Sequence, residues 1–185
     1  MKKEYTFNDL RQLYKSSVRK LTALQQFPEE QLLLKPDPSS WSVHEIIEHI
    51  LLFNKIYHKM IQSTLQKDNH PLSASKSFSA RFFIRPFISF VEPPYKIKIK
   101  TISPMRPAGE NHNQTHQLLD ELISFNTELI QLIEELTIQN LDLNRIKGRN
   151  KVFKFKMTLT EFFLMLAAHQ DRHIWQAEQT LKKIS

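Results

Sequence analysis

The sequence predicts an all-α protein, a four-helix bundle in which a long crossover connects the second helix to the third. Three observations favour this fold class. The chain of 185 residues contains only two glycines, which leaves few of the turns that an all-β fold requires. No proline follows Pro107, so nothing interrupts long helices in the remainder of the chain. Four segments repeat apolar residues at intervals of three and four, which is the pattern of an amphipathic helix.

The first two predicted helices are separated by a short proline-containing loop. The first is expected over residues 6–27, where the apolar positions share one face: Leu10, Leu13, Tyr14, Val18, Leu21 and Leu24. The second begins at Ser42, since Ser42 and Glu45 form the capping-box pattern of a helix start. It runs to about Leu65, with an inward stripe made of Ile46, His49, Ile50, Phe53, Tyr57 and Met60.

The third helix is the longest prediction, from about Glu110 to Gln139. Its apolar face consists of Leu118, Leu119, Leu122, Leu129, Ile133 and Leu136. The fourth helix opens on a second capping box, formed by Thr158 and Glu161, and lasts to about Lys183. Its inward residues are Leu159, Phe162, Phe163, Leu166, Ile174, Ala177 and Leu181.

The crossover between the second and third helices, residues 66–109, is basic and rich in phenylalanine. It carries eight lysines and arginines against two acidic residues, and five of the chain's 13 phenylalanines lie in it within 13 residues. One interpretation is a short helix broken at Pro86, whose rings pack on the bundle while the basic head groups stay in solvent. The other is a lid or a partner-binding surface, because exposed apolar patches mark interaction sites.

Two further runs alternate lysine with apolar residues, which is the period of a strand. They cover Lys96–Lys100 and Val152–Lys156. The two segments are expected either to pair as a small ribbon against one end of the bundle or to remain separate extended segments.

Composition excludes several classes of protein. A chain of this length holds one core, so residues 1–185 are expected to form a single domain. Cysteine is absent, which rules out disulfides, a thiolate nucleophile and cysteine-ligated metal. The N-terminal residues lack the apolar stretch of a signal peptide, and no segment approaches a membrane span, so a soluble cytoplasmic protein is predicted. The formal charge of +7 suggests nucleic-acid binding as an alternative. Each predicted helix is needed for the core, however, so none is left to serve as a recognition helix.

Histidines are the residues that suggest chemistry. His169 and His173 are four residues apart, which places both rings on one helix face, and that face is the core-facing stripe. His49 lies on the inward stripe of the second helix. Because buried imidazoles need partners, the three side chains predict one site for a divalent ion, with Zn²⁺ or Ni²⁺ favoured. Three protein ligands leave a coordination position open, which is typical of a catalytic site.

The remaining polar residues near these motifs receive other interpretations. His112 and His116 share the same spacing but lie in a polar stretch, so they are expected on a solvated face. Asp171 and Arg172 are expected to turn away from the site and form surface salt bridges. Gln176, one turn beyond the last histidine, is expected either to orient a metal ligand or to hydrogen-bond inside the bundle.

Two separated motifs resemble the DinB-like superfamily, which includes bacillithiol-dependent S-transferases and mycothiol-dependent isomerases. They are Trp41-Ser-Val-His-Glu-Ile-Ile-Glu-His49-Ile50 and His169-Gln-Asp-Arg-His173-Ile-Trp-Gln176. The resemblance implies an up-down-down-up bundle, a divalent metal held by three histidines and a homodimer. The positions that match those ligands are His49, His169 and His173.

The function expected from these observations is that of a metal-dependent transferase that uses a low-molecular-weight thiol on a small-molecule substrate. A metal-dependent hydrolase is the alternative enzyme. The other alternative is a bundle without enzymatic activity that binds a partner or acts in the response to DNA damage, from which the superfamily takes its name. The basic crossover is compatible with recognition of an anionic thiol cofactor.

Overall fold

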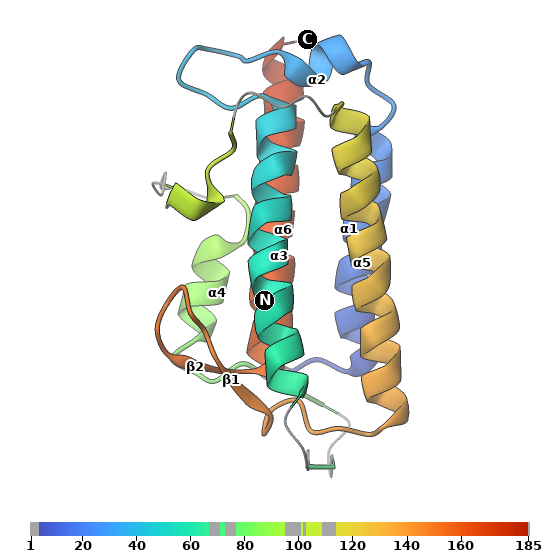
Figure 1. The fold of residues 1–185 in the computed structure, drawn as a ribbon, viewed down its shortest axis with the longest axis vertical. Coiled ribbons are helices and arrows are strands. Elements are labelled where there is room, and N and C mark those ends of the chain that lie inside the picture. The colour runs from blue at the N-terminus through green and yellow to red at the C-terminus, as the bar shows by residue number, and fades with distance from the viewer. Residues whose placement is uncertain are drawn as a thin grey trace.

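Four long helices lie side by side in the part of the chain that this computed structural model describes, residues 4–66, 71–72, 77–94, 101, 103–108 and 114–184. In Figure 1, the first and last run upward and the other two run downward, which confirms the predicted up-down-down-up bundle. None of the described helices combines the length and the apolar character needed to cross a membrane. The four helices are α1 (Phe7–Leu24), α3 (Val43–Leu65), α5 (Thr115–Ile138) and α6 (Leu159–Ile184).

Capping boxes fix the starts of α1, α3 and α6. At α3, the amide of Glu45 donates to Ser42 Oγ at 3.2 Å, and the amide of Ser42 donates to a Glu45 carboxylate oxygen at 2.8 Å. Thr158 and Glu161 repeat this exchange at α6. These hydrogen bonds confirm both capping boxes predicted from the sequence. Each box supplies partners for backbone amides that a helix start otherwise leaves without hydrogen bonds.

The helix α5 begins at Thr115, later than the predicted Glu110, and its cap comes from another helix. Its own N-cap residue makes no side-chain cap. Instead, the carboxylate of Glu29 accepts hydrogen bonds from the amides of Thr115 at 2.7 Å and His116 at 3.4 Å. Glu29 opens the short helix α2 (Glu29–Leu33), which the sequence pattern did not predict. A negative charge at this position also suits the positive end of the α5 dipole.

The same carboxylate holds His116, whose side chain is 36% exposed, so the predicted solvated face is correct in part for this residue, and His112 lies outside the described residues. Nδ1 of His116 is 2.9 Å from Glu29 Oε2, and Nε2 is 3.2 Å from the carbonyl oxygen of Gln25. Because both partners are acceptors, the ring satisfies both only when it is protonated. The hydrogen bond to Glu29 raises the pKa of His116 above 6.5. Burial raises the pKa of Glu29, but its hydrogen bonds outweigh burial and bring it below 4.5.

A pH-dependent contribution to stability follows from this pair. The raised pKa of His116 means that its contribution is complete below its unfolded value of 6.5 and is lost as the pH rises through the folded value. We expect His116→Gln to lower the free energy of unfolding by up to about 1 kcal/mol near pH 5.5, and by less near pH 8.5. Thermal unfolding of both proteins at the two pH values checks this. An equal difference at both pH values would show that the ring acts through packing alone.

Buried apolar side chains form two clusters along the described bundle. One surrounds Tyr14, Tyr57 and Phe162 near one end, and Tyr14 donates its hydroxyl hydrogen to the carbonyl oxygen of Phe163 at 2.8 Å. The other surrounds residues nearer the opposite end, such as Ile46 of α3. The predicted inward faces of α3, α5 and α6 are all buried. The two clusters meet at the level of the inward histidines.

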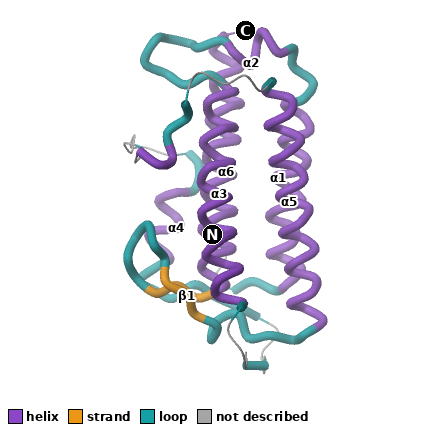
Figure 2. Tube along the Cα trace, viewed as in Figure 1, coloured by secondary structure: helices purple, strands orange, loops and turns teal. Residues whose placement is uncertain are grey.

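The crossover packs along the α3 and α6 side of the bundle (Figure 2). It contains α4 (Arg85–Val91) and the short 3₁₀ helix η1 (Ser103–Met105). Pro86 does not break a helix as predicted; it lies in the first turn of α4, where its missing amide hydrogen is not needed. The guanidinium of Arg81 forms a bidentate salt bridge with Glu161: Nε donates to Oε1 at 2.7 Å and Nη2 donates to Oε2 at 2.6 Å. This contact links the crossover to the start of α6.

The prediction that the crossover rings pack on the bundle is correct for some of them only. Phe78 is buried and pairs with Tyr5 through two backbone hydrogen bonds, and Phe87 is partly buried against the core. Phe82, however, is 81% exposed, and Phe83 and Phe90 are also exposed. Phe82 and Phe83 pack edge to face at 5.5 Å and form a small exposed apolar pair.

The strand predicted at Val152–Lys156 is wrong, because residues 151–155 form the turn of a hairpin. Its strands are β1 (Lys147–Arg149) and β2 (Lys156–Thr158), paired antiparallel. The side chain of Asn150 accepts hydrogen bonds from the amides of Val152 and Phe153, both at 2.9 Å, and this Asx-type geometry bends the chain. The other predicted strand, Lys96–Lys100, lies outside the described residues.

Candidate metal centre

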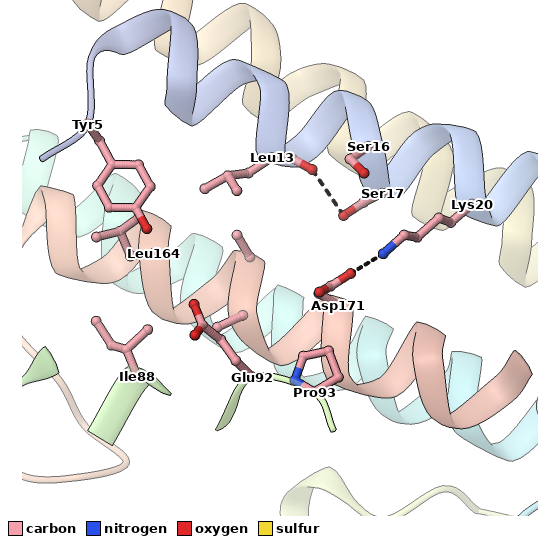
Figure 3. A pocket seen from close by; sticks show the side chains of 12 residues that line it. Tyr5, Leu13, Ser16, Ser17, Lys20, Ile88, Glu92, Pro93, Leu164 and Asp171 are labelled. Carbon is pink, nitrogen blue, oxygen red and sulfur yellow. Dashed lines mark hydrogen bonds and ion pairs between the residues drawn. The ribbon is translucent and has the colours of Figure 1, made fainter. Parts of the chain in front are cut away.

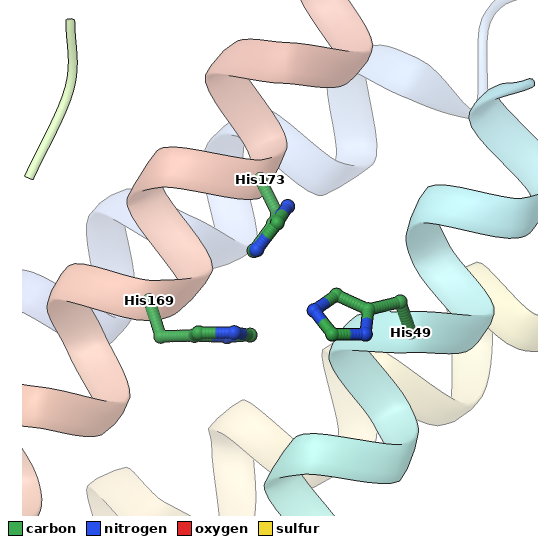
Figure 4. A group of neighbouring side chains, drawn as sticks. All are labelled: His49, His169 and His173. Atoms are coloured by element: carbon green, nitrogen blue, oxygen red, sulfur yellow. The ribbon is translucent and has the colours of Figure 1, made fainter. Parts of the chain in front are cut away.

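Three histidine rings converge between α3 and α6, where the two core clusters meet (Figure 4). His49 comes from α3, and His169 and His173 lie one turn apart on α6. One ring nitrogen of each lies within 4.8 Å of those of the other two. The ring centroid of His49 lies 5.1 Å from that of His169 and 4.5 Å from that of His173. The structure thus brings together the three residues that the sequence singled out.

Hydrogen bonds orient two of these rings. His49 donates Nδ1–H to the carbonyl oxygen of Met105 at 2.6 Å, and His173 donates Nδ1–H to Gln176 Oε1 at 2.9 Å. In each ring this tautomer leaves the lone pair of Nε2 for another partner. Of the two interpretations of Gln176, the structure supports the one in which it orients a candidate ligand. The carbonyl of Met105 carried no signal in the sequence, because any residue type supplies one.

Aromatic packing fixes the third ring. His169 stacks on Phe53, with ring centroids 3.5 Å apart and an angle of 6° between the planes. Nδ1 of His169 is buried without a hydrogen-bond partner among the described residues. A buried imidazole nitrogen without a hydrogen-bond partner is uncommon in folded proteins and is compatible with a metal ligand at this ring.

All three imidazoles favour the neutral form. Burial lowers the pKa of His173 to about 3, and His49 beside it acts in the same direction. Burial also lowers the pKa of His169 and of His49, although the hydrogen bond to Met105 opposes the shift in His49. The positive charge of Arg172 lowers all three pKa values further. Neutral imidazole is the state that binds a metal ion.

The prediction that Arg172 turns away from the site is wrong. Arg172 is buried and lines the same cavity as the three histidines. The reason is helical rotation: a residue three positions after His169 is displaced from it by about 60° around the axis, which keeps it on the same side. Asp171 does point away, and it forms the predicted salt bridge, with Lys20 of α1.

The other described histidines take no part in this cluster. His44 is buried and bonds through Nδ1 to the hydroxyl of Thr115 at 2.9 Å. His58 packs edge-on against Phe125, and His116 belongs to the α5 cap. His70 lies outside the described residues.

An apolar cavity of about 220 Å³ adjoins the histidines. Its walls include Phe53, Phe87, Phe153 and Met165, so they come from the bundle, from α4 and from the hairpin turn. The crossover and the hairpin therefore form the outer wall of the site.

A separate cavity of about 260 Å³ lies between α1, α4 and α6 (Figure 3). It contains the Lys20–Asp171 pair and Glu92. None of the three clustered histidines lines it, because it lies against the opposite face of α6. Its place in the fold gives it no share in the chemistry of the histidine cluster.

The fold and the cluster together define a helical bundle with a donor set suited to one divalent ion. The DinB superfamily model matches residues 12–177, and the chain belongs to that superfamily. Among solved structures, the chain is similar to YfiT from Bacillus subtilis, described as a probable metal-dependent hydrolase with an unusual four-helix bundle topology. The TM-score is 0.62 at 13% identity, over 96% of this chain and 87% of YfiT, a likeness that shows the fold alone. No curated protein matches the chain.

Proposed function

We propose that this protein is a metal-dependent transferase that transfers a low-molecular-weight thiol to an electrophilic small molecule. The observation that carries the proposal is the convergence of His49, His169 and His173, with ring nitrogens within 4.8 Å of one another. The donor set fits a divalent ion such as Zn²⁺ or Ni²⁺, because neutral imidazoles suit both and one buried nitrogen lacks any partner among the described residues. An ion held there would supply Lewis acidity that lowers the pKa of a thiol.

The residues around the cluster favour sulfur over water as the nucleophile. Phe53, Phe153 and Met165 make the cavity wall apolar and exclude water. No described residue that lines this cavity is an aspartate or a glutamate, so the site offers no carboxylate as general base for a hydrolytic water. A thiol that has already lost its proton needs no such base.

The chain's own residues would bind and orient the reactants in this reaction. The cationic side chain of Arg172 lies in the cavity wall and favours an anionic sulfur there. In the transfer, the sulfur forms a bond to the electrophilic carbon, and the leaving group departs with its electron pair. The thiol proton goes to solvent. The reaction as proposed belongs in the cytoplasm, where small thiols stay reduced.

Hydrolysis is the second candidate, and one observation favours it: the structurally similar YfiT is described as a probable metal-dependent hydrolase. The experiment that separates the two uses protein loaded with Zn²⁺ or Ni²⁺. One assay follows the conjugation of 1-chloro-2,4-dinitrobenzene with cysteine, glutathione or bacillithiol, and another follows the hydrolysis of p-nitrophenyl acetate without thiol.

We expect metal-dependent conjugation with at least one thiol and little metal-dependent ester hydrolysis. The matched control is His49→Ala, which should lose both the metal and the activity. Hydrolysis without thiol dependence would replace the transferase with the hydrolase. If the native protein takes up no metal, both enzymatic functions are refuted, and a bundle that binds a partner is the remaining alternative.

Gln176 offers a milder test of the same site. Because its Oε1 accepts the Nδ1–H of His173, Gln176→Leu should weaken metal binding by about 10- to 100-fold. Competition against a chromophoric chelator measures the affinity. Gln179→Leu, in the next turn of α6, is the control and should leave the affinity unchanged. Equal affinities for both variants would contradict the orienting role of Gln176.

A further inference from the structure

A second, larger cavity of about 480 Å³ lies against the outer side of the histidine cluster. Trp41, His173 and Gln176 form its inner wall. Arg106, Arg172 and Lys183 also line it, whereas no aspartate or glutamate does among the described residues. A concave site with cations and no carboxylate attracts anions.

The cationic groups are arranged to receive a ligand. Arg106 donates Nε–H to the carbonyl oxygen of Thr101 at 3.2 Å, which holds the side chain. Lys183 lies in the last turn of α6. The nearby carboxylate of Asp37 does not line the cavity, and it accepts hydrogen bonds from the hydroxyls of Ser39 and Ser40. These hydrogen bonds hold the carboxylate within its own loop, outside the cavity wall.

The basic cavity and the apolar cavity adjoin each other at His173. Thr101, Arg172 and His173 line both of them. One small molecule can thus place a charged end among the basic residues and an apolar part beside Phe53 and Phe153, with its middle next to the ring of His173.

We propose that the basic cavity binds the carboxylate or phosphate group of an amphiphilic small-molecule substrate, whose apolar part occupies the chamber beside Phe53. Arg106 and Lys183 bind the anion, and the apolar chamber selects the remainder of the molecule. The assignment of the ligand as a substrate rests on the proposed function, whereas the anion site itself does not.

The test is calorimetric titration of the metal-loaded protein with alkyl anions that share one chain length. Hexanesulfonate reports on the basic cavity, since sulfonates are weak metal ligands. Heptanoate and hexylphosphonate, which carry the same hexyl chain, then distinguish a carboxylate from a phosphate as the preferred group. Methanesulfonate and hexanol each remove one half of the ligand. Metal content is measured separately in every sample.

We expect hexanesulfonate to bind at least tenfold more tightly than methanesulfonate, because each buried methylene contributes about three- to fourfold, and hexanol to bind weakly. Arg106→Gln and Lys183→Gln should each weaken binding about fivefold, with the metal content unchanged. Lys182→Gln, the neighbouring lysine outside the cavity, is the matched control and should bind as the native protein does.

Equal binding of hexanesulfonate to the native protein and to the Arg106→Gln/Lys183→Gln double variant would overturn the proposal. Hexanol binding as tightly as hexanesulfonate would overturn it as well. A protein that contains metal but binds none of the anions would refute the anion site and leave the proposed function intact. A protein that binds the anions but takes up no metal would support the anion site and refute the proposed function.

Discussion

Replacing His173 with alanine is expected to abolish stoichiometric metal binding while the helical content stays unchanged. The native protein should hold about one Zn²⁺ or Ni²⁺ per chain. Loss of a residue that only orients a metal ligand weakens binding about 10- to 100-fold, so loss of a ligand atom should exceed that range. Elemental analysis of protein purified without a tag or a chelator, together with circular dichroism, makes the measurement.

His49→Ala and His169→Ala should behave in the same way, because all three rings converge on one point. The matched control is His58→Ala, which removes a histidine from the same helix as His49 but outside the cluster. It should keep the metal. Retention of one ion per chain in His173→Ala would show that the ion binds elsewhere.

The second large effect is expected on stability. Arg81→Met should lower the free energy of unfolding by about 3 kcal/mol, because it leaves the fully buried carboxylate of Glu161 without its cation. We choose the lower end of the usual range since Arg81 itself is 31% exposed. In a chain of this size the melting temperature should fall by about 6–12 °C, which calorimetry or a thermal scan measures.

Two variants test the cause of this loss. Arg149→Met removes an exposed arginine from the hairpin and should change the melting temperature by little. Arg81→Met combined with Glu161→Gln removes the buried charge as well, so it should recover part of the stability. If the single variant melted as the native protein does, the contact would not hold the crossover to α6.

The long helices and the histidine cluster were predictable because their signals are local. The apolar period identifies a helix wherever one face must be buried, and the boxes at Ser42 and Thr158 locate helix starts to the residue. His169 and His173 share a face by spacing alone. Joining His49 to them required only that the inward faces of two helices meet in one core.

What could not be predicted depends on residues that are distant in sequence. The start of α5 depends on Glu29, 86 residues before Thr115, and no capping motif reveals such a partner. The carbonyl that orients His49 belongs to Met105 in the crossover, and a backbone atom leaves no trace in composition. The hairpin turn carries the alternation of a strand, but Asn150 bends this segment through hydrogen bonds that the alternation does not reveal.

The position of Arg172 differs from the prediction because two candidate ligands on the same helix, and not one, define the face of the site. Its angle from His173 is about 100°, but its angle from His169 is only about 60°. A side chain between two ligands on a helix has to be measured from both of them. Its burial beside the cluster makes it a residue of the site.

The two helices that supply the cluster bring together parts of the chain roughly 120 residues apart, the distance from His49 to His169 in the sequence. In a protein without cysteine, a shared ion at this point would do what a disulfide does elsewhere: it would close a long loop and restrict the unfolded chain. Only the folded chain presents the three nitrogens together, so metal and folding are thermodynamically linked. At a free ion concentration 1,000 times the dissociation constant, that linkage amounts to about 4 kcal/mol, and a strong chelator would then act on this protein as a mild denaturant.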